Sequence, residues 1–193
     1  MATQPGERKL QILQTIAEML ESPEGEKVTT AALAAKLDVS EAALYRHFAS
    51  KAQMYEGLIE FIETSLFSVI NQIAEGEESG LRQVELILAS LLRFAQKNRG
   101  LTRVLVGDAL VFEKARLQQR INQLLDRIEA TLKQCLKVAA TQGALREGHD
   151  CAAHAGVLVD YVAGRWLRFV KSGFKDDPLG QWPAQWQLLA AAR

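Results

Sequence analysis

The chain of 193 residues carries 23 basic and 23 acidic side chains, so its formal net charge of zero lacks the basic excess that usually marks a nucleic-acid-binding protein. No stretch approaches the roughly 20 consecutive apolar residues of a membrane span, and the start of the chain lacks the apolar segment of a signal peptide. Two cysteines are too few for a disulfide framework, which favours a reducing compartment. From these three observations we expect a cytoplasmic protein with no membrane span.

The N-terminal quarter of the chain predicts a head of three helices. Apolar residues recur at helical spacing from Leu10 to Leu20, and the Ser-Pro-Glu-Gly segment 22–25 ends this first helix. Residues 28–48 then have the pattern of two short helices around a tight turn, which is the sequence form of a DNA-binding helix-turn-helix.

Single positions within residues 28–48 support this motif. Ala34 and Ala35 are small enough for two helices to cross closely, and Ser40 is placed to cap the second helix by accepting a backbone N–H from its first turn. Asp38 occupies the turn position that usually takes a left-handed glycine, and aspartate is one of the few other residues that tolerate this conformation. The expected core positions of the motif are Leu33, Leu37, Val39, Leu44 and Phe48.

The second helix of the motif is predicted to enter the major groove of duplex DNA. Four residues at its start would face the groove floor, because short side chains let a helix approach the base edges, and three further residues would lie at the rim. The floor residues are Ser40, Glu41, Ala42 and Ala43, and the rim residues are Tyr45, Arg46 and His47. The head is nearly neutral, so its phosphate contacts depend on a few cations, namely Arg8, Lys9, Lys27, Arg46 and Lys51. The alternative is a helical hairpin in the core of an unrelated all-α protein.

The rest of the chain predicts a helical body, so we divide it into a DNA-binding domain at residues 1–49 and a body at residues 50–193. Ser50 and Gln53 have the capping-box spacing that starts a long helix. The segment 151–171 is apolar around most of its circumference and needs two surfaces to pack on. Together with a last helix at about 183–192, it predicts a homodimer interface, and burial within one chain is the alternative.

The sequence Leu-Tyr-Arg-His-Phe at residues 44–48 leads directly into Ser50 and Lys51 in an all-helical chain, and this arrangement resembles the TetR family of regulators. The resemblance implies an all-α fold with an N-terminal helix-turn-helix head and a helical C-terminal dimerisation body. Two such heads in a dimer would bind one near-palindromic duplex, and the resemblance implies roles for single residues there. Tyr45, His47 and Lys51 would hold the DNA backbone, and Thr29 or Thr30 would help the recognition helix to choose the sequence.

Four segments, at residues 39–48, 58–63, 100–103 and 120–124, resemble one branch of this family, the nucleoid occlusion factors. This resemblance implies a DNA-bound, nucleoid-associated homodimer that antagonises the tubulin-like division GTPase FtsZ, so that the septum does not close over the chromosome. The N-terminal arm departs from the pattern, since it is short and carries only two basic residues.

The resemblance also implies a partner surface on the outer faces of the first two body helices, including Phe61 and Asn98. The residues themselves add a cationic patch of Arg93, Lys97 and Arg99, which suits an acidic, partly apolar peptide. The alternatives are that the cations only form a solvated helix face and that Phe61 belongs to the core.

Two other classes of function are weighed against this hypothesis. A TetR-type transcriptional repressor released from DNA by a small molecule requires a cavity lined by the middle helices, with polar residues such as Asn71, Asn122 or Asp160 turned inward. An enzyme is disfavoured, because the sequence contains no phosphate loop, nucleophile elbow or convincing carboxylate pair. His149 and His154 lie near other potential metal ligands at a loop-to-helix junction, but we expect neither a metal nor a cofactor there.

Overall fold

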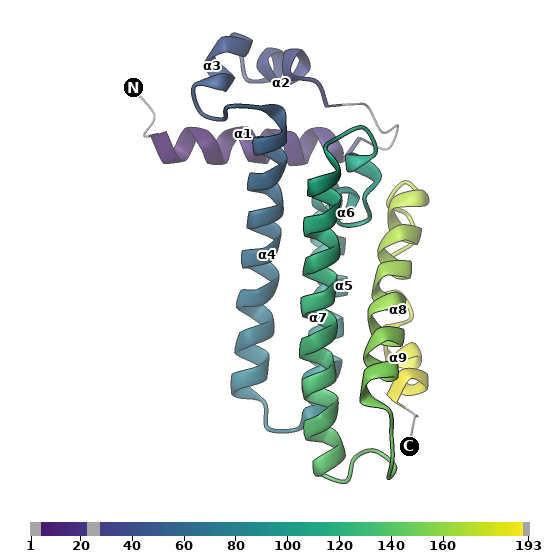
Figure 1. The fold of residues 1–193 in the computed structure, drawn as a ribbon. Helices are drawn as coiled ribbons and strands as arrows, with labels where there is room; N and C mark the ends of the chain where they lie inside the picture. The colour runs from purple at the N-terminus through teal and green to yellow at the C-terminus, as the bar shows by residue number, and fades with distance from the viewer. Residues whose placement is uncertain (1–4, 23–27, 191–193) are drawn as a thin grey trace. The chain divides into compact units, whose positions relative to one another are not determined.

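The computed structural model describes residues 5–22 and 28–190, and Figure 1 draws the remaining residues as a thin grey trace. The described residues form helices and no strand, so the all-α prediction is confirmed. None of the described helices combines the length and apolarity needed to cross a bilayer. The elements in chain order are α1 (Pro5–Leu20), α2 (Thr30–Lys36), α3 (Glu41–Tyr45), α4 (Lys51–Gly76), α5 (Gly80–Lys97), α6 (Arg99–Leu105), the 3-10 helix η1 (Asp108–Leu110), α7 (Ala115–Thr141), α8 (Cys151–Lys171) and α9 (Trp182–Ala190).

The chain forms two compact units, and each is described on its own. Unit 1 comprises residues 1–62 and 98–121, and unit 2 comprises residues 63–97 and 122–193. The three N-terminal helices therefore share a compact unit with the first part of α4, α6, η1 and the first residues of α7.

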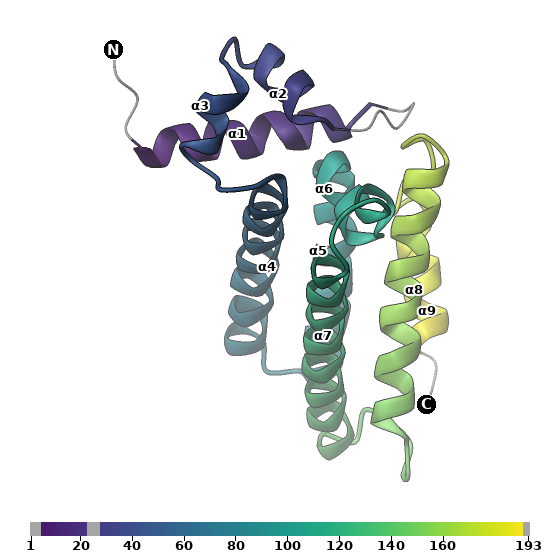
Figure 2. The same ribbon diagram turned by 45° about the horizontal axis from the view of Figure 1, so that its top comes forward.

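In unit 1, α2 and α3 lie together along α1 in both views (Figures 1 and 2). Apolar side chains from α1, the helix-turn-helix, α4 and α6 are removed from water together, and this burial stabilises the unit. The buried side chains include Ile12, Ile16, Leu20, Leu33, Leu44, Phe48, Met54, Leu58, Ile59, Leu101 and Val104.

The contact between α6 and α1 is a close approach of two backbones. A Cβ atom added at Gly100 would lie 2.0 Å from the carbonyl oxygen of Ala17, so only glycine fits there. Arg103, one turn further along α6, donates hydrogen bonds to the carbonyl of Ser22 at 2.9 Å and to the Asp108 carboxylate at 2.9 Å. Residues of α1, α6 and η1 are thus fixed to one another.

The core of unit 2 contains a completely buried indole. Trp166 of α8 is 1% exposed, and its Nε1 donates a hydrogen bond to the carbonyl of Leu91 in α5 at 3.2 Å. At the start of α5, a Cβ atom on Gly80 would lie 2.4 Å from the backbone of Ala139 in α7, so these helices also approach closely. The other buried residues of this unit include Ile87, Leu88, Leu92, Leu124, Ile128, Leu132, Leu136, Leu158, Val162 and Phe169.

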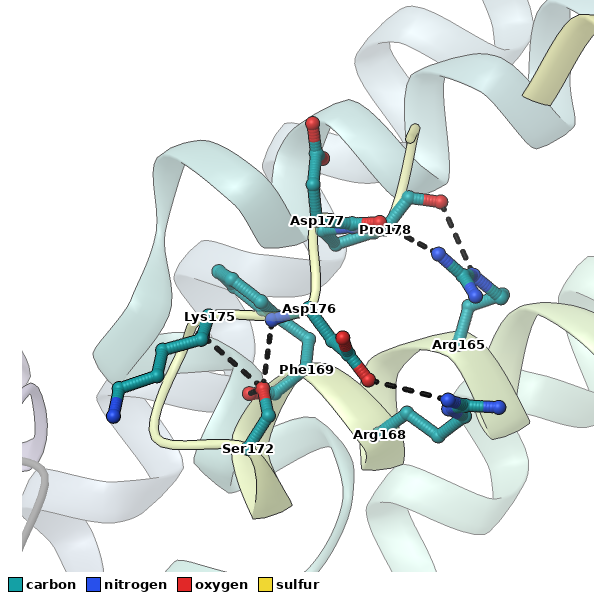
Figure 3. A network of polar contacts seen from close by, with 8 residues as sticks. All are labelled: Arg165, Arg168, Phe169, Ser172, Lys175, Asp176, Asp177 and Pro178. Atoms are coloured by element: carbon teal, nitrogen blue, oxygen red, sulfur yellow. Dashed lines mark hydrogen bonds and ion pairs between the residues drawn. The ribbon is translucent and has the colours of Figure 1, made fainter. Parts of the chain in front are cut away.

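Polar contacts hold the loop between α8 and α9 (Figure 3), in addition to the buried Phe174, whose ring centroid lies 5.2 Å from that of Phe169. Arg165 donates to the carbonyls of Asp177 at 2.6 Å and Pro178 at 3.3 Å. The Ser172 hydroxyl accepts the backbone N–H groups of Lys175 and Asp176 at 3.1 and 2.8 Å. These bonds define where the chain turns back from α8 into α9.

Candidate nucleic-acid interface

The turn between α2 and α3 has the geometry that the sequence predicts. The Thr29 hydroxyl caps α2 by accepting the N–H of Ala32 at 3.1 Å, and the Ser40 hydroxyl caps α3 by accepting the N–H of Ala43 at 3.3 Å. Asp38 adopts the left-handed conformation, with a φ of 52°. The predicted cap at Ser40 and the predicted conformation of Asp38 are therefore confirmed.

The residues predicted to face DNA are largely accessible. α3 comprises only five residues, of which Leu44 is buried and holds the helix on the core. Ala43 and His47 are half-buried, as is Thr30 at the start of α2, and the other positions are exposed. The exposed ones are Thr29, Ser40, Glu41, Ala42, Tyr45 and Arg46.

Two of these residues contact each other across the motif. The Thr30 hydroxyl of α2 donates a hydrogen bond to Glu41 Oε2 of α3 at 2.5 Å. Sequence reasoning placed both residues at the DNA but did not foresee this bond, because nothing in the spacing of 11 residues indicates it.

Lys51, the first residue of α4, is paired within unit 1. Its Nζ lies 2.5 Å from Glu113 Oε1 and 5.5 Å from the centroid of the Tyr55 ring. The side chains of Lys51 and Glu113 are 23% and 12% exposed. Burial, and then the nearby Glu113 carboxylate, raise the pKa of the Tyr55 phenol above its ordinary value, so Tyr55 stays neutral. A phosphate that approaches Lys51 meets a lysine that already has a carboxylate partner.

The other predicted cations of the head differ in their surroundings. Arg8 donates to Gln11 Oε1 at 2.6 Å on the surface of α1, and Lys9 Nζ lies 5.7 Å from the centroid of the Phe48 ring. Arg46 is exposed, and Lys27 lies outside the described residues.

A groove of about 480 Å³ lies on another face of unit 1, between α1, α4 and the start of α6. Phe61 and Asn98, the two partner residues implied by resemblance, both line it. Phe61 is 46% exposed, so it does not belong to the core. The apolar lining is Leu10, Leu13, Ala17, Leu58, Phe61 and Leu101, and the acidic side chains Glu18 and Glu21 also line the groove.

The remaining predicted partner residues belong to unit 2. Arg93 and Lys97 are exposed and lie four residues apart near the end of α5, so they share one face of that helix. Figure 1 labels α5, on which both lie.

The polar residues required by the ligand-cavity hypothesis do not point inward. Asn71, Asn122 and Asp160 are all exposed, and the side chain of Trp166 in α8 is buried and hydrogen-bonded to α5. Near His149, the described residues contain no group of three potential ligands that could hold a metal ion. His149 and His154 instead contact each other through ring nitrogens at 2.9 Å.

Family profiles match both parts of the chain. Residues 12–58 match the profile described as bacterial regulatory proteins, tetR family. Residues 78–192 match a SlmA-like profile described as tetracyclin repressor-like, C-terminal domain.

Curated relatives match over nearly the full length. The nucleoid occlusion factor SlmA of Marinomonas sp. (strain MWYL1) is 47% identical over 190 residues, which cover 98% of this chain and 96% of the relative. The nucleoid occlusion factor SlmA of Aliivibrio fischeri (strain MJ11) is 51% identical over 189 residues, which cover 95% and 94%.

Solved structures share the fold at lower identity. The regulator FadR from Bacillus subtilis, in complex with stearoyl-CoA, is 17% identical, with a TM-score of 0.74 and coverage of 95% of this chain and 98% of that one. The TetR family regulator PfmR from Thermus thermophilus is 20% identical, with a TM-score of 0.76 and coverage of 93% and 96%. At such identities these structures support the fold alone.

Proposed function

The chain belongs to the TetR family of DNA-binding regulators, which is not an enzyme family, and within it to the SlmA nucleoid occlusion factors; from this premise we propose how it acts. A homodimer binds a near-palindromic site in chromosomal DNA through its two helix-turn-helix heads. In that state it antagonises the assembly of FtsZ, so that no septum closes over the nucleoid. The observation that carries the proposal is the identity of about half of all residues to SlmA proteins across both parts of the chain.

For the DNA interface, we assign recognition of the base sequence to residues at the N-termini of α2 and α3. We assign contacts with the DNA phosphate backbone to residues further along the chain. The short side chains Ala42 and Ala43 support close approach of α3 to the groove floor. The sequence-choosing residues are Thr29, Thr30, Ser40, Glu41, Ala42 and Ala43, and the backbone contacts are Tyr45, Arg46, His47 and Lys51.

For the dimer, we assign α8 and α9 as the interface. Val157 and Leu167 of α8 and Leu188 of α9 are large apolar side chains that water reaches in the single chain, with Leu188 78% exposed. A second copy would cover them, and a two-fold axis through the dimer would match the symmetry of a near-palindrome. Of the predicted interface at 183–192, residues 191 and 192 lie outside the described residues.

For the contact with FtsZ, the groove that contains Phe61 and Asn98 supplies apolar surface of a size that suits a peptide. Arg93 and Lys97 belong to unit 2 and supply a cationic surface on α5 that suits an acidic peptide. Glu18 and Glu21 also line the groove, so the groove itself suits an apolar segment of the partner rather than an acidic one.

The test is the assembly of purified FtsZ, followed by light scattering. The protein is added with a duplex that it has selected from a random library, or with a scrambled duplex of the same composition. We expect assembly to fall further with the selected duplex. The absence of any effect under all conditions would favour the ligand-responsive repressor instead.

Two sets of variants separate the interfaces in this assay. Phe61→Ala, and Arg93→Glu combined with Lys97→Glu, should weaken the effect on FtsZ and leave DNA affinity unchanged. Tyr45→Phe combined with Lys51→Ala should weaken DNA binding first. A loss of both activities in the Phe61 or Arg93 variants would indicate misfolding rather than a partner surface.

A further inference from the structure

The recognition helix offers very few polar atoms to DNA. Of its five residues, Ala42 and Ala43 have no polar side-chain atom, and Leu44 is 1% exposed. Only Glu41, in the first turn, and Tyr45, at the last position, carry side chains that can hydrogen-bond to a base or a phosphate. A carboxylate is therefore the principal hydrogen-bonding group at the end of α3 that is expected to enter the groove.

This carboxylate is held from the neighbouring helix. The Thr30 hydroxyl donates to Glu41 Oε2 at 2.5 Å, which restricts the rotamers of the glutamate. No basic side chain among the described residues forms an ion pair with Glu41, and Glu41 itself is exposed. Oε1 therefore keeps its capacity to accept a hydrogen bond from outside the protein.

The base that fits such a group follows from the pattern of donors in the major groove. An ionised carboxylate only accepts hydrogen bonds, so guanine and thymine, which present acceptors there, are repelled. On cytosine itself the N4 amino group is the only hydrogen-bonding group at the major-groove edge, and it is a donor, whereas adenine presents its N6 amino donor together with its own N7 acceptor. Cytosine is thus the base whose own hydrogen-bonding atoms in the major groove best match a carboxylate.

We propose that Glu41, positioned by Thr30, reads the N4 amino group of one cytosine in each half-site. The proposal rests on the proposed function, since it requires that α3 enters the major groove. It makes Thr30 a positioning residue and Glu41 the specificity-determining residue at that base pair.

The experiment begins with a random duplex library from which the wild-type protein selects its site. Each base pair of one half-site is then changed in turn, and affinities are measured by fluorescence anisotropy for wild type, Glu41→Gln, Thr30→Val and Thr30→Ser. A further duplex carries 2-pyrimidinone, which lacks the 4-amino group, in place of the cytosine. Lys51→Ala serves as a matched comparison, because the loss of a phosphate contact weakens all duplexes alike.

We expect one cytosine whose replacement weakens wild-type binding about fivefold to a hundredfold. The 2-pyrimidinone duplex should show the same loss. Both losses should shrink in Glu41→Gln and Thr30→Val at that position alone, while Thr30→Ser, which keeps the hydroxyl, should behave as wild type. Thermal unfolding of each variant confirms that it is folded.

Two results would overturn the inference and are distinguishable. If the Glu41 and Thr30 variants weaken every duplex equally, the pair only stabilises the motif, and the proposed DNA binding stands without this reading of cytosine. If wild type selects no duplex at all, the proposed function fails together with the inference.

Discussion

Loss of the ion pair between Lys51 and Glu113 should have opposite effects on the stability of the protein and on its affinity for DNA. Lys51 is proposed to contact a phosphate of the DNA backbone, yet its Nζ already lies 2.5 Å from the Glu113 carboxylate. Replacement of Glu113 by Gln removes the charge of the competitor and keeps the shape of its side chain. The variant should therefore be less stable than wild type but bind DNA more tightly.

The magnitude follows from the exposure of the pair. Ion pairs in full contact with water contribute about 0.2–1 kcal/mol, whereas breaking a buried pair costs about 3–5 kcal/mol. With side chains that are 23% and 12% exposed, the pair lies between these limits, at about 1–2 kcal/mol. If a DNA phosphate has to displace the Glu113 carboxylate from Lys51, the Glu113→Gln variant no longer loses this free energy on binding. Its affinity for DNA should then be about five- to thirtyfold higher.

The assay is a double-mutant cycle on the selected duplex, with denaturant unfolding measured in parallel. In a Lys51→Ala background, Glu113→Gln should no longer change the affinity. Asp108→Asn is the matched control, because it removes the same charge from a carboxylate that pairs with Arg103 at 2.9 Å instead of with Lys51. Equal gains in affinity from the Asp108 and Glu113 variants, or a weaker complex with Glu113→Gln, would refute the competition.

Three further predictions concern stability. Gly100→Ala should destabilise the protein by about 1–3 kcal/mol or more, because its Cβ would meet the Ala17 carbonyl at 2.0 Å; an unchanged denaturation midpoint would contradict that contact. Trp166→Ala should cost about 3–5 kcal/mol through the cavity it leaves and the lost bond to the Leu91 carbonyl, and Trp166→Phe should cost less in the same unfolding titration. Burial lowers the pKa of His154 below its ordinary 6.5, so the folded state binds the proton less readily than the unfolded chain, and stability should decline as the pH falls below about 6.5; His154→Gln should flatten this decline in thermal unfolding across pH.

Features set by neighbouring residues could be predicted from the sequence. The Ser40 cap and the left-handed Asp38 depend on backbone only a few residues away. The same holds for the start of α4, where the Ser50 hydroxyl accepts the N–H of Gln53 at 3.2 Å and the Gln53 side chain accepts the N–H of Ala49 at 2.8 Å. Local propensity and tertiary structure agree at these positions, so short patterns were sufficient.

Features set by residues far apart in the chain could not be predicted in this way. Glu113 is 62 residues from Lys51, and no periodicity links the two. The sequence left open whether Phe61 belongs to the core or to a partner surface, and the structure shows it 46% exposed, because a repeat of 3.6 residues does not fix how wide the buried face of a helix is. The roles of the predicted DNA and partner residues remain predictions for the variants described above.

The close backbone contact between α1 and α6 determines which part of this regulator could be exchanged as a module. A hybrid that takes residues 1–49 into a different body would separate Ala17 of α1 from Gly100 of α6, and any residue larger than glycine in that place would meet the Ala17 carbonyl. Grafting at that boundary is expected to strain or separate the junction, unless residues 98–121 are transferred too. Exchange of only the exposed residues of α2 and α3 leaves the contact between Ala17 and Gly100 intact, so the residues proposed to face DNA can be changed without disturbing it.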